Sequence, residues 1–295
     1  DLDNDESLLP LTPGHEMVGR VVELGEGVTS LAVGERVVAY FYLSCWRCRA
    51  CLSGRESRCE RLAGWYGVHR DGGYAPMTVL PAGNAVLVPE GIDAAAATAI
   101  PDAIATPVHV CHTRLGLRPG DRVAVIGAGG GVGIHMLQVA SAYGASVAGL
   151  ERGERKLEVI ERFGGIPLDS TDFSAVKLSD FGGEADAVID LVGTPQSLAW
   201  GFEHLATGGR LCVLTTFRDV ELRVDPRELV FRESSVIGSR YASRSELLEA
   251  AALVQSGRVT PVIGATAAPA DVGDLHEELR AGNLEGRGAL VWTGS

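Results

Sequence analysis

The sequence of 295 residues lacks long apolar runs and has few basic residues. No apolar run reaches the roughly 18 residues of a membrane-spanning helix, so we expect no such helix and no membrane partner. Lys and Arg number 26 against 38 Asp and Glu, which gives a formal net charge of −12. Nucleic acids and anionic membrane surfaces bind basic faces, and this balance argues against both. The length exceeds that of a usual single domain, so we expect two domains.

Cysteine is also scarce, but four of the six cysteines stand within fifteen residues in the pattern C-x2-C-x2-C-x7-C. They are Cys45, Cys48, Cys51 and Cys59. Four thiolates on one short loop surround a tetrahedral Zn²⁺ and leave no open position for a substrate, so the pattern predicts a structural zinc. Two disulfides are the alternative. We disfavour them because no secretory signal precedes the cluster and a chain of this length builds its own core.

The other two cysteines, Cys111 and Cys212, stand in apolar surroundings and are predicted to be small core residues. Reduced thiols combined with a thiolate metal site are typical of the cytoplasm, where we expect the protein to reside.

The residue patterns that predict strands and helices change along the chain. Residues 1–7 are acidic and are predicted to form a loop or a frayed end. Alternating β-branched residues then predict strands at 18–24, 36–40, 74–80 and 85–88, and an alanine-rich helix runs from 94 towards 113. The last segment predicts helices at 245–255, with Ser243 or Ser245 as N-cap, and 272–281, and a strand at 288–292.

The middle of the chain alternates short apolar runs with helical patterns. Strands are predicted at 122–126, 146–150, 166–168, 187–191, 211–214 and 236–237, with helices at 132–143, 155–163 and 196–205. Such alternation predicts an α/β fold with a doubly wound parallel sheet, covered by helices on both faces.

A glycine-rich turn joins the strand 122–126 to the helix 132–143. This context is the one that a phosphate-binding turn requires, because glycines let the backbone approach a pyrophosphate and the helix N-terminus supplies free N–H groups. The spacing departs from G-x-G-x-x-G, since Val132 holds the sixth position; a turn one residue longer, ending on Gly133, is the second reading. The predicted cofactor cradle comprises Gly127, Gly129, Gly130, Gly131, Val132 and Gly133.

Glu151 follows the second strand of this unit, eighteen residues beyond Gly133. A carboxylate there accepts hydrogen bonds from the adenosine ribose hydroxyls and repels a 2′-phosphate, so NAD is predicted ahead of NADP. The adjacent Arg152 is the opposing signal, since a guanidinium binds that phosphate. Alternatively, both side chains are simply solvated at a strand end.

Three more residues are candidates for a catalytic metal site. His15 and Glu16 lie just before the first predicted strand, and Asp102 follows Pro101 in an apolar stretch. His15 is a possible zinc ligand with Glu16 beside it, although a surface histidine is the ordinary alternative. Asp102 is either an oxygen ligand or the N-cap of the helix that follows.

Together these motifs resemble the zinc-containing alcohol dehydrogenases of the medium-chain dehydrogenase/reductase superfamily, from about residue 11 to the end. The resemblance implies a β-rich, GroES-like catalytic domain at 1–104, with the structural zinc lobe at 45–59. It implies a Rossmann NAD-binding domain at 105–238 and a return segment, 239–295, that completes the catalytic domain.

The resemblance also implies individual roles. His15 matches a catalytic-zinc ligand, Glu16 its acidic neighbour, and Asp102 a position that is cysteine, aspartate or glutamate in the family. Thr106 matches a threonine near the nicotinamide, and Arg287 a basic residue that approaches the pyrophosphate. Loops near residues 65–66 and 241 would contribute to the substrate pocket.

One departure from the family stands out. The first catalytic-zinc ligand of these enzymes is a cysteine upstream of the histidine, followed by a Ser or Thr that relays a proton. This chain has no cysteine before Cys45, and fourteen residues precede His15. We expect the chain to be truncated at its N-terminus relative to the working enzyme; the alternative is a member without a full catalytic zinc site.

The expected reaction is reversible hydride transfer between a small-molecule alcohol and NAD, giving an aldehyde or ketone, with zinc as Lewis acid. A zinc-independent reductase of a quinone, enone or enoyl thioester is the first alternative. A protein that binds NAD and structural zinc without chemistry is the second. The family also implies a homodimer or homotetramer.

Overall fold

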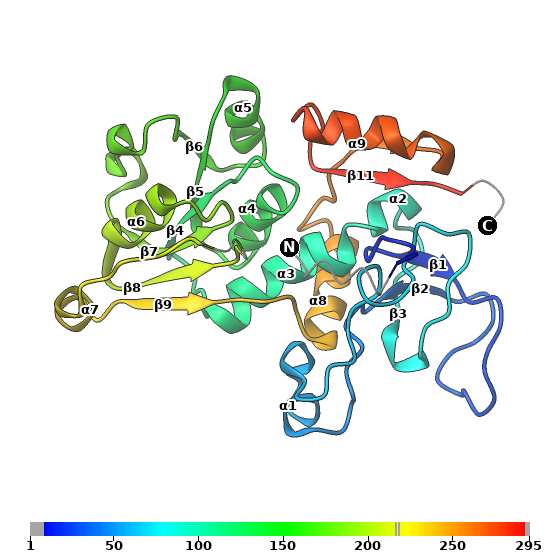
Figure 1. Ribbon diagram of the computed structural model, residues 1–295. Helices are drawn as coiled ribbons and strands as arrows, with labels where there is room; N and C mark the ends of the chain where they lie inside the picture. The colour runs from blue at the N-terminus through cyan, green and yellow to red at the C-terminus, as the bar shows by residue number, and fades with distance from the viewer. Residues whose placement is uncertain (1–8, 216, 218, 293–295) are drawn as a thin grey trace. The chain divides into compact units, whose positions relative to one another are not determined.

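The computed structural model describes residues 9–215, 217 and 219–292, so the loop expected at 1–7 lies outside the described residues. The chain divides into two units (Figure 1): Asp1–Ala105 with Tyr241–Ser295, and Thr106–Arg240. We call them the terminal unit and the central unit. No helix in the described part of the chain is both long and apolar enough to cross a membrane.

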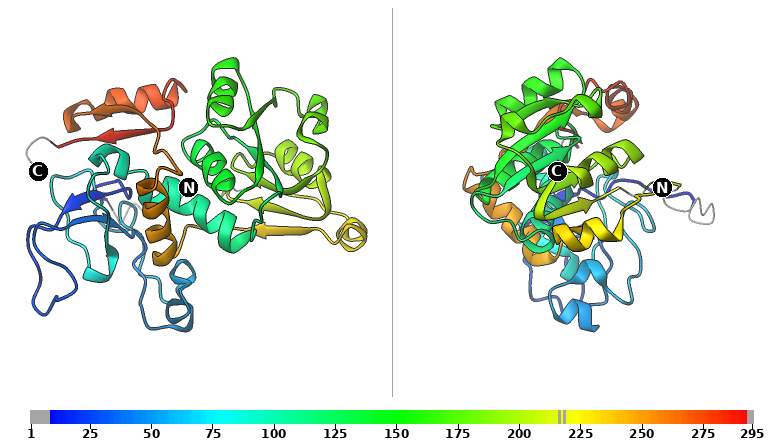
Figure 2. Two further views of the ribbon diagram at one scale, coloured as in Figure 1. Left: turned by 180° about the vertical axis from the view of Figure 1, so that it is seen from behind. Right: turned by 90° about the vertical axis from the view of Figure 1, so that its left-hand side faces the viewer.

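The central unit is built on one six-stranded sheet in the order β6-β5-β4-β7-β8-β9, and every neighbouring pair is parallel. Its strands are β4 (Arg122–Ile126), β5 (Ser146–Glu151), β6 (Ile166–Asp169), β7 (Ala185–Asp190), β8 (Leu205–Val213) and β9 (Ser235–Gly238). Its longer helices are α4 (Gly133–Ala142), α5 (Glu154–Arg162), α6 (Pro195–Glu203) and α7 (Pro226–Arg232). The doubly wound parallel sheet expected from the sequence is confirmed, with β9, the yellow strand of Figure 2, at one edge.

The central strands are buried on both faces, as a parallel sheet covered by helices requires. Four of the five residues of β4 are buried, as are the last four of β7. Helix α4 packs on β4 and β5, and α6 packs on β7 and β8. This rigid layer holds the loops at the carboxyl ends of the strands, where α/β sheets bind ligands.

The terminal unit contains two small sheets. One is antiparallel, in the order β1-β2-β3, with β1 (Val18–Arg20), β2 (Arg36–Ala39) and β3 (Ala85–Leu87). The other pairs β10 (Ile263–Ala267) with β11 (Arg287–Leu290) in parallel. The α-helices of this unit are α1 (Arg49–Leu52), α2 (Ala94–Ala97), α8 (Arg244–Gln255) and α9 (Val272–Arg280); Ser243 is the N-cap of α8, in a capping box with Glu246.

Two expectations for the strands and helices between residues 74 and 113 are wrong. The strand expected at 74–80 is irregular, because Pro76 cannot donate to a ladder and Met77 and Val79 are 73% and 87% exposed. The continuous helix expected from 94 towards 113 is divided into α2, a π-helical turn Ile100–Ile104, α3 (Ala105–Val108) and a second π-helical turn, His109–Arg114. Pro101 and Pro107 each remove a backbone donor there, which explains the irregular hydrogen bonding.

The sequence analysis missed α7 and β10. Strand β10 has the sequence Ile-Gly-Ala-Thr-Ala, which has little of the β-branched signal that predicts a strand. A Cβ on Gly264 would lie 2.2 Å from the carbonyl oxygen of Glu285, so the small residue serves a close backbone approach.

Candidate functional site

The four clustered cysteines form a compact sulfur group in the terminal unit. Their Sγ atoms all lie within 4.8 Å of one another. Cys48 and Cys51 are separated by 3.5 Å, and Cys45 and Cys51 by 4.0 Å. A zinc ion with Zn–S bonds of about 2.3 Å places its sulfurs about 3.8 Å apart, so the donor set fits a tetrahedral zinc.

Hydrogen bonds tune these thiols for metal binding. Backbone N–H groups of Cys51 and Glu60 lower the pKa of Cys48 to about 6, so this sulfur is a thiolate at neutral pH. Burial is the main cause that raises the pKa of Cys51 to about 12, and metal binding must displace that proton. All six cysteines are free thiols, and no sulfur pair in the cluster approaches the 2.05 Å of a disulfide.

His15 and Asp102 are brought together although 87 positions separate them. His15 Nε2 lies 3.2 Å from Asp102 Oδ2, and both side chains are partly buried. The imidazole packs on Phe41, with ring centroids 4.5 Å apart. Burial alone lowers the pKa of His15, but the hydrogen bond and charge of Asp102 outweigh it, and the pKa lies above its ordinary value.

Asp102 does not cap a helix. It lies inside the π-helical turn Ile100–Ile104, and the residue that caps α2 is Asp93, whose carboxylate accepts from the backbone N–H of Ala96 at 3.0 Å. The capping alternative for Asp102 is therefore wrong, and its carboxylate is available to His15.

Glu16 and Arg287 form a second pair beside the first, and they are 271 positions apart in the chain. The Arg287 guanidinium donates to Glu16 Oε2, and the backbone N–H of Ala103 reaches Glu16 Oε1 at 3.3 Å. Burial raises the pKa of Glu16, although Arg287 opposes this shift. An approach of Arg287 to a pyrophosphate stays a prediction.

The described residues offer two candidate ligands for a catalytic zinc, His15 and Asp102, rather than three. Tetrahedral ligands at about 2.0 Å from zinc lie about 3.3 Å apart, close to the His15–Asp102 separation. Groups of three or more metal-binding side chains occur, within the described ranges, only at the cysteine cluster. A catalytic zinc needs three protein ligands. The pair therefore fits two corners of a site, and we derive no step of the reaction through this metal.

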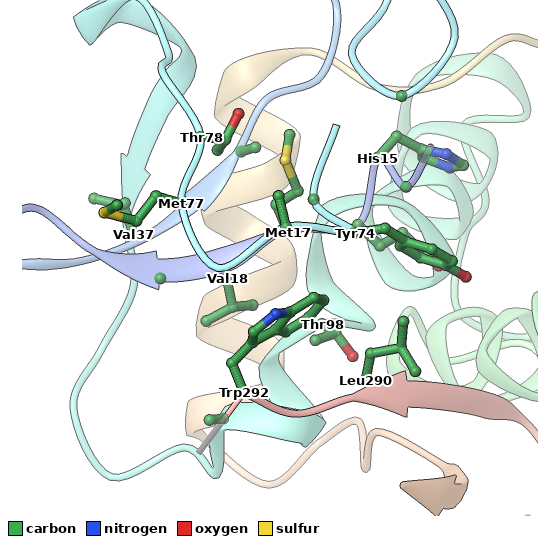
Figure 3. A pocket seen from close by; sticks show the side chains of 18 of the residues that line it. His15, Met17, Val18, Val37, Tyr74, Met77, Thr78, Thr98, Leu290 and Trp292 are labelled. Atoms are coloured by element: carbon green, nitrogen blue, oxygen red, sulfur yellow. The ribbon is translucent and has the colours of Figure 1, made fainter. Parts of the chain in front are cut away.

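A cavity of about 1300 Å³ borders His15 (Figure 3). Glu16 and Arg287 also line it, whereas Asp102 is not among its lining residues. Its lining includes His15 and the apolar side chains of Met17, Met77, Leu290 and Trp292. It exceeds the usual volume of a small-molecule pocket, and it follows β1, the edge strand of the antiparallel sheet. We therefore interpret it as a groove along a sheet edge.

The central unit carries the glycine turn at the carboxyl end of β4. Gly127 has φ of +82°, and its N–H donates to Leu150 at 2.9 Å. A Cβ on Gly133 would lie 2.2 Å from the carbonyl oxygen of Gly127 and 2.7 Å from the Cα of Ala128. Gly133 is thus the glycine that permits close packing of helix and strand, which matches the turn one residue longer.

Glu151 ends β5 and reaches over this turn. Its carboxylate accepts from the backbone N–H of Gly129 at 3.2 Å and from the N–H of Arg152 at 3.0 Å. Lys156 Nζ lies 3.5 Å from the same carboxylate. Lys156 was not expected from the sequence. It lies in the first turn of the helix that follows the strand ending at Glu151, and this position could have indicated the contact.

Thr106, the other cofactor-site residue expected in this unit, is buried at the start of α3.

The His15–Asp102 pair makes a pH-dependent prediction. In chelator-treated protein, the NMR titration of His15 should have a midpoint above 6.5, and Asp102→Asn should lower it. Because the folded pKa is raised, the stability that Asp102 contributes is fully present below pH 6.5 and is lost as pH rises through the folded pKa. An unchanged His15 midpoint in Asp102→Asn would contradict the pairing.

Comparisons with known proteins agree with this arrangement. A family model described as "Alcohol dehydrogenase GroES-like domain" matches residues 3–90, and one described as "Zinc-binding dehydrogenase" matches residues 131–256. An alcohol dehydrogenase of Geobacillus stearothermophilus is 32% identical over 95% of this chain and 82% of its own. An acryloyl-coenzyme A reductase of Metallosphaera sedula is 30% identical over 96% of this chain and 83% of its own. A solved NAD-dependent alcohol dehydrogenase aligns with a TM-score of 0.88 at 31% identity, covering 96% of this chain and 84% of that one.

A parallel six-stranded sheet with a glycine turn and a β-rich unit with a four-cysteine cluster define an alcohol dehydrogenase-like oxidoreductase. The chain belongs to the zinc-containing alcohol dehydrogenase family of the medium-chain dehydrogenase/reductase superfamily. The expected combination of a GroES-like and a Rossmann fold is confirmed.

Proposed function

We propose that the protein transfers a hydride reversibly between a small-molecule alcohol and NAD, forming an aldehyde or ketone. The observation that carries this proposal is the His15–Asp102 pair, at the spacing of two zinc ligands and next to the partly buried Glu16–Arg287 pair. The alcohol dehydrogenase of G. stearothermophilus, at 32% identity, supports the same reaction class.

NAD is the proposed cofactor. The Glu151 carboxylate stands beside the glycine turn and accepts a hydrogen bond from the N–H of Gly129, which supports a role as acceptor for ribose hydroxyls. A 2′-phosphate would meet this negative charge. The exposed Arg152, and Lys156 with its Nζ 3.5 Å from the same carboxylate, are the groups that would offset the repulsion. The relative named as NAD-dependent supports the NAD assignment.

Reduction of an activated double bond is a second candidate. The described residues supply two catalytic-zinc ligands, and the reductase of M. sedula is named for acryloyl-coenzyme A, an enoyl thioester. This reaction also moves a hydride from the nicotinamide, so the same cofactor unit serves both candidates.

Steady-state assays combined with metal analysis test the proposal. We expect NADH oxidation with aldehydes or ketones and a preference for NADH over NADPH. Two zinc ions per chain by mass spectrometry would mean that a further residue joins His15 and Asp102 as a ligand of the catalytic zinc. One zinc per chain with turnover of enones or enoyl thioesters would support the second candidate. Cofactor binding without turnover of any of these compounds would reject both reactions.

We also propose that the protein forms a homodimer or homotetramer and resides in the cytoplasm. Strand β9 lies at the edge of the sheet, and Val230, Phe231 and Val236 on α7 and β9 are 71%, 70% and 42% exposed. An edge strand beside exposed apolar side chains supports pairing with a second copy. Sedimentation analysis measures the mass, and a monomer at micromolar concentration would reject this assembly.

A further inference from the structure

Asp190 is a fully buried carboxylate at the carboxyl end of β7, next to the glycine turn. Its relative exposure is 0%, and β7 pairs directly with β4 up to the contact of Asp190 with Ile126. A buried carboxylate is costly unless hydrogen bonds satisfy it, so its partners indicate what it does.

Both carboxylate oxygens of Asp190 are used. Oδ1 accepts from the backbone N–H groups of Val192 and Gly193 at 2.7 and 2.9 Å. Oδ2 accepts from the Ser197 hydroxyl at 2.7 Å. Because both backbone N–H groups donate to the same oxygen, the two bonds fix the backbone conformation of the loop 191–193.

This loop forms a wall against the glycine turn. A Cβ on Gly127 would lie 2.9 Å from Val192 Cγ2 and 3.5 Å from Leu191 Cβ, so the two segments are in close contact. The N–H of Leu191 also donates to Ile126 at 3.2 Å. On its other side, a Cβ on Gly193 would meet Thr215 at 2.1 Å. A displacement of the loop therefore changes the surface beside the turn.

The position of this wall within the sheet matters. From β4 the chain winds outward through β5 and β6, and from β7 it winds the other way through β8 and β9. In open α/β sheets the ligand lies at the carboxyl ends of the strands where the winding reverses, which here is between β4 and β7. Asp190 stands at that point.

Helix capping does not account for the carboxylate. Helix α6 already has Thr194 as its N-cap, with the N–H of Ser197 donating to Thr194 Oγ1 at 3.0 Å and the N–H of Thr194 donating to Ser197 Oγ at 2.9 Å. The backbone bonds of Asp190 go to the loop before the helix.

We propose that Asp190 is a positioning residue for the dinucleotide, holding the loop 191–193 in the conformation that receives the cofactor beside the glycine turn. This inference rests on the proposed NAD-binding function. Asp190 acts through the backbone of Val192 and Gly193 and does not itself touch the cofactor.

The test compares NADH affinity, by fluorescence titration, with thermal stability in full-length variants. Asp190→Ala leaves the N–H groups of Val192, which is partly buried, and Gly193, which is buried, without their acceptor. We expect its dissociation constant for NADH to rise at least tenfold. Asp190→Asn keeps an oxygen at the Oδ1 position, and its amide can donate to Ser197, whose hydroxyl already lies 3.1 Å from the Thr194 carbonyl oxygen. Asparagine should therefore recover most of the affinity.

Ser197→Ala is the matched control. It removes the bond to Oδ2 and weakens the start of α6, but leaves the loop bonds to Oδ1, so we expect reduced stability with wild-type affinity. If Asp190→Ala does not fold, Asp190→Ser replaces it in the test. The serine hydroxyl is too short to reach both N–H groups, so we again expect the dissociation constant for NADH to rise at least tenfold.

The outcomes separate this assignment from the proposed function. Wild type that binds no nicotinamide nucleotide overturns the proposed function and this role with it. Two results would overturn only the role of Asp190, provided that wild type binds NADH. One is that Asp190→Ala binds NADH as tightly as wild type. The other is that Ser197→Ala, at the same loss of stability, loses as much NADH affinity as Asp190→Ala.

Discussion

Replacing Cys51 by serine is expected to remove one zinc ion per chain and unfold the segment 45–59. Cys51 is buried and lies within 4.0 Å of the sulfurs of both Cys45 and Cys48, so a weak hydroxyl ligand at its position breaks the tetrahedral set. Structural zinc contributes roughly 10–16 kcal/mol of apparent free energy in small zinc domains, more than the lobe's small apolar core can replace. Zinc content by mass spectrometry and limited proteolysis of the segment measure the result.

The matched control is Cys111→Ala, in which a cysteine of the central unit is replaced. Cys111 is fully buried, and its sulfur lies 3.9 Å from that of Met136, outside any metal-binding group. We expect full zinc content, with a stability loss of the order of 1 kcal/mol for the lost packing. A Cys51→Ser protein that keeps its zinc and resists proteolysis would show that the sulfur cluster is not a metal site.

Local patterns predicted the central unit well. The strand at 122–126 was predicted to the residue, and the extra strand at 236–237 exists as β9. In both cases a short apolar run lies between turn residues. The sheet buries the run of β4, and β9 pairs with β8 at the edge of the sheet, where Val236 stays 42% exposed.

The candidate site in the terminal unit depends on distant contacts. The sequence marked His15, Glu16 and Asp102 as candidate metal-site residues, and the family resemblance added Arg287. The pairing of Glu16 with Arg287, however, joins residues 271 positions apart. No periodicity encodes such a contact. Asp190 carried no signal at all, because a carboxylate that ends an apolar strand is usually solvated, and only the fold shows that this one is buried.

Replacing Gly133 by alanine is expected to weaken productive cofactor binding strongly. The added Cβ would lie 2.2 Å from the Gly127 carbonyl oxygen and 2.8 Å from the Ala128 carbonyl carbon, and both are backbone atoms that no side-chain rotation can move. The turn must therefore shift by more than half an ångström from α4. Overpacking of this kind costs about 1–3 kcal/mol of stability. A shift of about 1 Å at a binding element can cost about 100-fold in rate, so we expect kcat/KM for NADH to fall by about that factor.

Gly273→Ala distinguishes this clash from a general effect of alanine. Gly273 lies in α9, has no atom within 4 Å of the position of an added Cβ, and belongs to the terminal unit. Alanine favours a helix over glycine by roughly 1 kcal/mol, so this variant should be slightly more stable and keep the wild-type kcat/KM. If Gly133→Ala retained wild-type turnover while remaining folded, the turn would tolerate a side chain. The close packing of α4 on β4 would then not be what shapes the proposed pyrophosphate site.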